Sequence, residues 1–303
     1  MEAHARNEAW KILQERMQEN PGQSAETAAR GNSTLTGKAI EQTRRDKMMS
    51  LAKLQDLTGR VALVTGGSRG LGLQMAEVLG ELGAKVAITA RKRDELEAAA
   101  RHLKSLGIEA LPLVCDMGDL ATIPSMVEQV IASLGPIDIL VNNAGTSWGA
   151  PTIEHTLDGW NKVINLNVTA IFIVSQEVGR RSMLPRRSGK VINIASIQGL
   201  TGCYPDGVPT LAYNASKGAV VNMTRTLANE WAPFGINVNA IAPGYFPTKM
   251  TAQLDTDATS EMAPMKRGGG PEDLKGVTAL FASDACAFIT GQTLAVDGGL
   301  TAI

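Results

Sequence analysis

Short apolar runs alternate with amphipathic, helix-like stretches along most of this chain. Each run is apolar at nearly every position rather than at every second one, as in strands of a parallel sheet covered on both faces. Seven runs predict strands, at 61–65, 85–89, 110–115, 139–142, 191–195, 236–241 and 293–296. This alternation predicts an α/β fold: a single doubly wound, Rossmann-type domain with a parallel sheet of about seven strands and helices on both faces.

The first predicted turn from strand to helix is rich in glycine. Residues 65–72 read Thr-Gly-Gly-Ser-Arg-Gly-Leu-Gly. Glycines at such a turn allow the backbone to approach a pyrophosphate, whose charge the N-terminus of the following helix stabilises. The position predicts a nucleotide-binding loop, and the alternative is merely a tight turn.

Tyr213 and Lys217 stand four residues apart in a predicted helix and therefore on one face of it. A phenol loses its proton near pH ~10, and a nearby ammonium favours the phenolate and lowers that pKa. Such a pair can act as a general acid/base near neutral pH. The spacing alone would also fit two ordinary residues on a helix surface. The position of the pair after the glycine-rich turn and Ser196 favours a catalytic role.

These two motifs and several others follow one another in the order found in the short-chain dehydrogenase/reductase family. The chain resembles that family over residues 57–303. The motifs are Thr-Gly-x-x-x-Gly-x-Gly at 65–72, Asp116, Asn-Asn-Ala-Gly at 142–145, Asn167, Ser196, the Tyr213/Lys217 pair and Pro-Gly-x-x-x-Thr at 243–248. The resemblance implies reversible hydride transfer between a nicotinamide and a ketone or secondary alcohol, and a homotetramer built through 160–184, 213–231 and the C-terminal segment.

The resemblance also implies roles for individual residues. Tyr213 would exchange the proton of the substrate oxygen, which Ser196 would hydrogen-bond. Lys217 would hold the nicotinamide ribose and lower the pKa of Tyr213, and Asn167 would help carry a water to Lys217. Trp148, with Ser196 and Tyr213, would line the substrate pocket; a buried packing role for Trp148 is the open alternative. The expected cofactor contacts are Gly66, Ser68, Arg69, Gly70, Leu71, Gly72, Arg91, Asp116, Met117, Asn143, Ala144, Gly145, Tyr213, Lys217, Pro243, Gly244, Phe246 and Thr248.

Cations follow the second predicted strand, at the place where an acid would select NAD(H). Residues 89–93 read Thr-Ala-Arg-Lys-Arg, with no acid before Asp94, and Arg69 adds a cation in the glycine-rich turn. Guanidinium groups bind phosphate through paired, charge-assisted hydrogen bonds. We therefore expect NADP(H), with NAD(H) as the alternative. The other interpretation of Arg91–Arg93 is that they are only a solvated helix start, although cations are unfavourable at that end of a helix.

The substrate is less constrained. Residues 142–149 and 242–251 resemble the 3-oxoacyl reductase of rhamnolipid biosynthesis, which favours reduction of a 3-oxoacyl thioester. Residues 137–140 and 296–299 are shared with gluconate 5-dehydrogenases and many relatives, so a polyol or sugar-acid dehydrogenase is an alternative. A non-catalytic nicotinamide-binding sensor is a third, disfavoured by the intact catalytic set.

Three segments around the predicted site bear on substrate choice. Tyr213 follows Ser196 by 17 positions, longer than we expect in the family, and the Gly/Pro-rich residues 199–209 between them predict an enlarged loop at the cleft rim. Phe246 stands where an aliphatic residue is common. Residues 249–264 predict a mobile lid.

A basic cluster has two interpretations. It comprises Arg180, Arg181, Arg186, Arg187 and Lys190. In the simpler interpretation, these cations stabilise the C-terminus of a helix. The other is a dock for an acidic acyl-carrier protein.

Composition excludes several classes of protein. The net charge of −1 gives no electrostatic case for nucleic acid. No apolar run approaches the ~18 residues that span a bilayer, and the N-terminus lacks the apolar core of a secretory signal. Three widely spaced cysteines fit a reducing compartment, so we expect a cytoplasmic protein. No Cys/His cluster has metal-ligand spacing, so we expect no catalytic metal.

The first part of the chain differs from the rest. Residues 1–53 are polar, which favours a flexible or partly helical N-terminal extension before a dinucleotide-binding catalytic domain at 54–303. A short amphipathic helix is expected at 8–19, from apolar residues at helical spacing, Trp10, Leu13 and Met17. The alternative to a flexible extension is a helix that packs on a neighbouring subunit.

Overall fold

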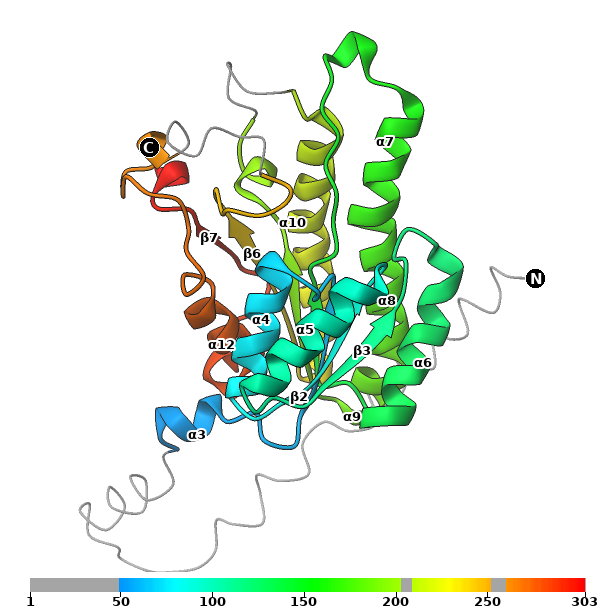
Figure 1. Ribbon diagram of the computed structural model, residues 1–303. Helices are drawn as coiled ribbons and strands as arrows, with labels where there is room; N and C mark the ends of the chain where they lie inside the picture. Colours follow the sequence, from blue (N-terminus) through cyan, green and yellow to red (C-terminus); the bar gives the residue numbers. More distant parts are fainter. Residues whose placement is uncertain (1–48, 203–208, 252–259, 303) are drawn as a thin grey trace, which may run out of the picture. The chain divides into compact units, whose positions relative to one another are not determined.

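The computed structural model describes residues 49–202, 209–251 and 260–302, and these residues fold around a parallel sheet (Figure 1). Its strands are β1 Val61–Thr65, β2 Lys85–Ala90, β3 Ala110–Val114, β4 Ile139–Asn142, β5 Gly189–Ile194, β6 Ile236–Pro243 and β7 Thr293–Val296. Their order is β3-β2-β1-β4-β5-β6-β7, and every neighbouring pair is parallel. The predicted doubly wound fold is confirmed. The helix expected at 8–19 lies outside the described residues.

The strand bounds agree closely with the expected ones. β1, β4 and β7 have the predicted bounds, while β2 and β6 run on to Ala90 and Pro243. β5 begins at Gly189 rather than 191, because Gly189 and Lys190 pair with Ile236 and Asn237 of β6. Pairing with a neighbouring strand, which a single run of residues does not reveal, sets these ends.

Helices cover both faces of the sheet. The α-helices are α3 Leu51–Gln55, α4 Gly70–Glu81, α5 Arg93–Ser105, α6 Ile123–Leu134, α7 Leu157–Ile164, α8 Ala170–Val178, α9 Leu184–Arg186, α10 Leu211–Trp231 and α12 Lys275–Ala282. Helices α4, α5 and α12 share one apolar core with inward residues of the strands. Helices α8 and α10 pack on the other face with residues of β5 and β6, and α6 packs against α8.

Short helical turns join these elements. Those of 3₁₀ type are η1 Leu120–Thr122, η2 Thr152–Glu154, η5 Ile197–Gly199, η6 Ala232–Phe234, η7 Asp284–Cys286 and η8 Leu300–Ala302. Two π-helical turns, η3 Asn165–Thr169 and η4 Gly179–Met183, join α7, α8 and α9 end to end. Such wide turns often occur at functional sites, and η3 carries Asn167.

The sheet order defines where a ligand can bind. β1 lies between β2 and β4, so the connections leaving β1 and β4 run to opposite sides of the sheet. In open α/β sheets the crevice at the carboxyl ends of such strands is the usual ligand site. The glycine-rich turn after β1 and residues 142–145 after β4 both lie at this edge.

A buried chain of side-chain hydrogen bonds fixes the elements beneath this edge. Asn142 Nδ2 donates to Asn193 Oδ1 at 2.9 Å and to Ser175 Oγ at 3.1 Å. Asn193 Nδ2 in turn donates to Thr224 Oγ1 at 2.9 Å. Strands β4 and β5 are thereby tied to α8 and α10, and α10 carries the tyrosine and the lysine of the predicted site.

Candidate active site

The glycine-rich turn has a backbone that side chains would disrupt. Gly66 and Gly70 have φ values of 66° and 53°, in the left-handed region that favours glycine. A Cβ on Gly72 would lie 2.3 Å from the Gly66 carbonyl oxygen and 2.4 Å from Asn143 Nδ2. The turn therefore packs closely on the segment after β4 and leaves the N-terminus of α4 open toward a ligand, a cradle that fits a pyrophosphate.

Asn143 braces this turn. Its Nδ2 donates to the carbonyl oxygens of Thr65 and Gly66 at 2.9 and 3.0 Å. Its own N–H donates to Thr65 Oγ1 at 3.0 Å. The Asn-Asn-Ala-Gly segment thus acts through positioning: its first asparagine ties strands together and its second shapes the glycine-rich turn.

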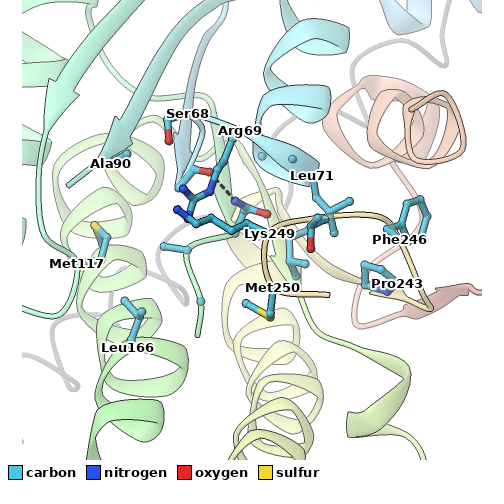
Figure 2. Close-up of a pocket in the computed structure, with 18 of the residues that line it drawn as sticks. Ser68, Arg69, Leu71, Ala90, Met117, Leu166, Pro243, Phe246, Lys249 and Met250 are labelled. Atoms are coloured by element: carbon cyan, nitrogen blue, oxygen red, sulfur yellow. Dashed lines mark hydrogen bonds between the residues drawn. The ribbon is translucent and has the colours of Figure 1, made fainter. Parts of the chain in front are cut away.

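A cleft of about 280 Å³ runs along this edge of the sheet (Figure 2). All residues expected to contact the cofactor line it, together with Ser196. Trp148 and Asn167 are not among its lining residues. Ten further residues line the cleft but were not predicted to: Ala90, Lys92, Glu95, Cys115, Leu166, Ile194, Ala195, Lys249, Met250 and Thr251. Most of these are direct neighbours of predicted residues, so extending each motif by a few positions would have found them.

The reacting groups meet at one end of the cleft. Ser196 follows β5 and caps η5, where its Oγ accepts from Gln198 N–H at 3.2 Å. The Tyr213 side chain hydrogen-bonds Ser196. Lys217, one turn along α10, holds its Nζ 5.6 Å from the centre of the Tyr213 ring. Proton donor, oxyanion partner and cation are therefore neighbours.

Burial, rather than mutual attraction, sets the titration of this pair. It raises the pKa of Tyr213, against a smaller lowering by the hydrogen bond to Ser196. It lowers the pKa of Lys217 to about 8. The net shift of the Tyr213 pKa is therefore upward, and Lys217 is not among its causes. The physical reason is that a poorly hydrated site disfavours both charged forms, while the Lys217 Nζ donates to the Ile194 carbonyl at 2.6 Å.

Asn167 positions its neighbours rather than lining the cleft. It is fully buried. Its Oδ1 accepts from Thr146 N–H at 2.9 Å, and its Nδ2 donates to the Thr146 carbonyl and to Ser216 Oγ, each at 2.9 Å. Ser216 lies between the tyrosine and the lysine on α10. One amide thus ties the segment after β4 to the catalytic helix.

Charged residues lie at the other end of the cleft, after β2. Arg69 Nη1 donates to both carboxylate oxygens of Glu95 at 2.8 Å. Lys92 Nζ lies 3.4 Å from Glu95 Oε1. Arg91 also lines the cleft. The cations Arg69 and Arg91 were expected here, but Glu95 was not. It lies four residues after Arg91, and the first turn of helix α5 brings it into the cleft.

Trp148 lies outside the cleft lining, against α7. A Cβ on Gly159 would lie 2.6 Å from Trp148 Nε1, and Lys162 Nζ lies 5.9 Å from the ring centre. The Trp148 side chain is 39% exposed, so the buried packing role is wrong. The segment after Trp148 is tied to the end of residues 199–209, because Ala150 N–H donates to the Pro209 carbonyl at 2.9 Å. Residues 203–208 of the expected enlarged loop lie outside the described residues.

Phe246 is explained by packing. Its ring lies against Gly269, where a Cβ would approach to 2.3 Å, and the residue is 4% exposed and joins the apolar core. The unusual aromatic therefore fills space beside a glycine while its residue still borders the cleft. Residues 252–259 of the expected lid lie outside the described residues; Lys249, Met250 and Thr251 before them line the cleft.

The basic cluster is engaged in structural contacts. Arg180 and Arg181 bond Glu177, Arg186 bonds Asp138, Arg187 donates to the Pro233 carbonyl, and buried Lys190 donates to Asn237 Oδ1. Lys190 and Asp138 lie at the start of β5 and just before β4, whereas the cleft lies at the carboxyl ends of the strands. These contacts favour the structural interpretation over a dock beside the active site.

Comparison with known proteins agrees with this geometry. Residues 60–259 match the family described as short chain dehydrogenase. The chain belongs to that family. As a short-chain dehydrogenase it is an oxidoreductase of the dehydrogenase/reductase type, acting on CH–OH and C=O groups.

Relatives within the short-chain dehydrogenases include both enzyme types expected above. The chain is 40% identical over 258 residues to gluconate 5-dehydrogenase of Gluconobacter oxydans, covering 84% of this chain and 99% of the relative. It is 40% identical over 252 residues to the rhamnolipids biosynthesis 3-oxoacyl-[acyl-carrier-protein] reductase of Pseudomonas aeruginosa, covering 80% and 96%. A gluconate 5-dehydrogenase of Burkholderia cenocepacia, solved in complex with NADP and tartrate, is 37% identical with a TM-score of 0.78, covering 84% of this chain and all of that one.

Two features are absent from the part of the chain that the structure describes. No helix among them is both long and apolar enough to cross a membrane. No three of their His, Cys, Asp and Glu side chains are grouped as metal ligands.

Proposed function

We propose that this short-chain dehydrogenase is an NADP(H)-dependent reductase of 3-oxoacyl thioesters. The observation that carries the proposal is one cleft with Tyr213, Ser196 and Lys217 at one end and a glycine-rich turn with Arg69 and Arg91 at the other. The first group suits a carbonyl and the second a phosphorylated dinucleotide.

The chain's residues divide the work of carbonyl reduction. The nicotinamide supplies the hydride when bound, so the protein must bind, orient and move a proton. Ser196 donates a hydrogen bond to the substrate oxygen, and Tyr213 gives that oxygen its proton as it becomes a hydroxyl. Raising the pKa of Tyr213 keeps the phenol protonated and ready to donate. Lys217 holds the ribose of the cofactor, and Asn167 keeps the catalytic helix in register with the segment after β4.

NADP(H) is favoured by the cations after β2 and in the glycine-rich turn. Arg91 and Arg69 present guanidinium groups suited to a 2′-phosphate dianion. The Burkholderia cenocepacia relative, in complex with NADP, supports the same choice. NAD(H) is the alternative cofactor, and direct binding measurements separate the two.

An acyl substrate is favoured by apolar residues near the reacting groups. Leu166 and Met250 line the cleft, and Met250 is 50% exposed, so an apolar chain would cover it. The second candidate, a sugar-acid dehydrogenase, is supported by the similarity to the gluconate 5-dehydrogenase of Gluconobacter oxydans. A carrier-bound substrate would bring an acyl-carrier protein to the mouth of the cleft rather than to the basic cluster.

A substrate panel tests the proposal. Acetoacetyl thioester, gluconate and its 5-keto form, mannitol and simple ketones would each be assayed with NADPH/NADP or NADH/NAD. We expect the highest kcat/KM for the thioester with NADPH. Highest activity on the gluconate pair would favour the second candidate. NADPH binding without turnover of any panel member would favour a sensor.

We also propose a cytoplasmic homotetramer. The buried free cysteines Cys115 and Cys286 suit a reducing compartment. The half-exposed Phe172 of α8 lies within the segment 160–184 expected at a subunit interface. Light scattering of the purified protein measures the oligomeric state directly.

A further inference from the structure

An acid shares the end of the cleft that holds the cations. Glu95 lines the cleft with Arg69, Arg91 and Lys92. Its two oxygens both accept from Arg69 Nη1 at 2.8 Å, and Lys92 Nζ lies 3.4 Å away. The Glu95 side chain is 25% exposed, against 49% for Arg69. Because the Glu95 carboxylate is less exposed than the Arg69 side chain, it holds the arginine against α5.

Arg91 differs from these two cations. Among the residues that the structure describes, no carboxylate is paired with Arg91, although it lines the same end of the cleft. A phosphate group binding here would meet one available guanidinium and one already neutralised by Glu95. It would also meet the charge of Glu95 itself, in a cleft where screening by water is incomplete.

We propose that Glu95 sets the cofactor selectivity of this cleft by competing with the 2′-phosphate of NADP(H) for Arg69. The inference rests on the proposed use of NADP(H). A cofactor with a 2′-hydroxyl brings no charge to this position, so the competition weakens NADP(H) binding and leaves NAD(H) binding nearly unchanged. Arg69 and Arg91 create a preference for NADP(H) over NAD(H), and Glu95 makes that preference smaller.

A simpler role for Glu95 makes a different prediction. Asp94 and Glu95 lie in the first turn of α5, where acids stabilise the helix dipole. Loss of that stabilisation would lower the stability of the protein and change the affinities for NADPH and NADH by the same factor. The ratio of the two dissociation constants therefore separates the two roles.

The test measures Kd for NADPH and NADH by calorimetry on the full chain, before and after Glu95→Gln. We expect the ratio Kd(NADH)/Kd(NADPH) to rise about five- to tenfold, from tighter NADPH binding, because an ion pair of this kind contributes on the order of 1 kcal/mol. Glu97→Gln is the matched control, since Glu97 is an exposed acid of the same helix outside the cleft lining. It should leave the ratio unchanged.

A second variant shows whether Arg69 carries the effect. In an Arg69→Met background, Glu95→Gln should raise the ratio by less than half as much as in the wild type, because only the direct repulsion by Glu95 remains once Arg69 is gone. An unchanged or smaller ratio for Glu95→Gln, or the same rise in the Arg69→Met background, would overturn the inference. Should Glu95→Gln not fold, Glu95→Asp keeps the helix charge while shortening the side chain, and it should raise the ratio in the same direction. Wild-type protein that binds neither cofactor would instead overturn the proposed function.

Discussion

Lys217 donates its Nζ to the Ile194 carbonyl at 2.6 Å while lying 5.6 Å from the centre of the Tyr213 ring. The lysine is thus anchored on the end of β5, beside the tyrosine ring. The carbonyl accepts a hydrogen bond from the ammonium, but burial still lowers the pKa of Lys217 to about 8.

This lowered pKa predicts a dependence of stability on pH. Between about pH 8 and pH 10.5 the unfolded chain binds the lysine proton more tightly than the folded chain, so stability from this group rises with pH through that window. Urea unfolding between pH 8 and 9.5 should show this rise in the wild type. Lys217→Met should lack it. Parallel curves for the two proteins would contradict the assignment of the titrating group to Lys217.

Asn167 should matter for both stability and activity. Asn167→Ala removes the partner of the Thr146 N–H and of the Thr146 carbonyl, while Ser216 Oγ keeps its bond to the Tyr213 carbonyl. Each buried polar group left without a partner costs about 1–3 kcal/mol. Urea unfolding should therefore show a large destabilisation. kcat should also fall, with less change in KM, because the catalytic helix loses its register with the segment after β4. A variant as stable as the wild type would show that these hydrogen bonds contribute little.

Gly72 should tolerate no side chain. A Cβ there would meet the Gly66 carbonyl at 2.3 Å, so Gly72→Ala must displace the glycine-rich turn. We expect Kd for NADPH to rise more than about tenfold. Gly276→Ala is the matched control, since Gly276 lies in α12 with no atom within 4 Å of the added Cβ. Equal NADPH affinity in both variants would show that the turn does not form the binding site.

Arg91 should carry much of the preference for NADP(H). Arg91→Asp replaces an available guanidinium with a charge that repels the 2′-phosphate and can accept from a 2′-hydroxyl. The ratio of kcat/KM for NADPH to that for NADH should fall by at least about tenfold. An unchanged ratio would refute the role of Arg91.

The strands and the site motifs were predictable because each depends on local chemistry. A buried parallel strand must be apolar throughout, and the turn after β1 must be rich in glycine to avoid clashes such as the one at Gly72. Asn167 and Ser196 were found by family resemblance, since neither has a local pattern of its own.

What escaped prediction depends on contacts between distant segments. Glu95 reaches Arg69 across 26 positions of sequence, and the side chain of Trp148 turned to α7 rather than to the cleft. The upward net shift of the Tyr213 pKa was not foreseen, because the spacing of Tyr213 and Lys217 reveals a neighbouring charge but not the burial of both groups. Burial is a property of the whole fold and cannot be read from a spacing of four residues.

The most direct test of the account is the rate of NADPH oxidation with acetoacetyl thioester, compared between the wild type and Tyr213→Phe. We expect steady oxidation by the wild type and a loss of at least about 100-fold in kcat for the variant, with Kd for NADPH changed by less than about threefold. A Tyr213→Phe variant that turns over as fast as the wild type would contradict the assignment of Tyr213 as the proton donor.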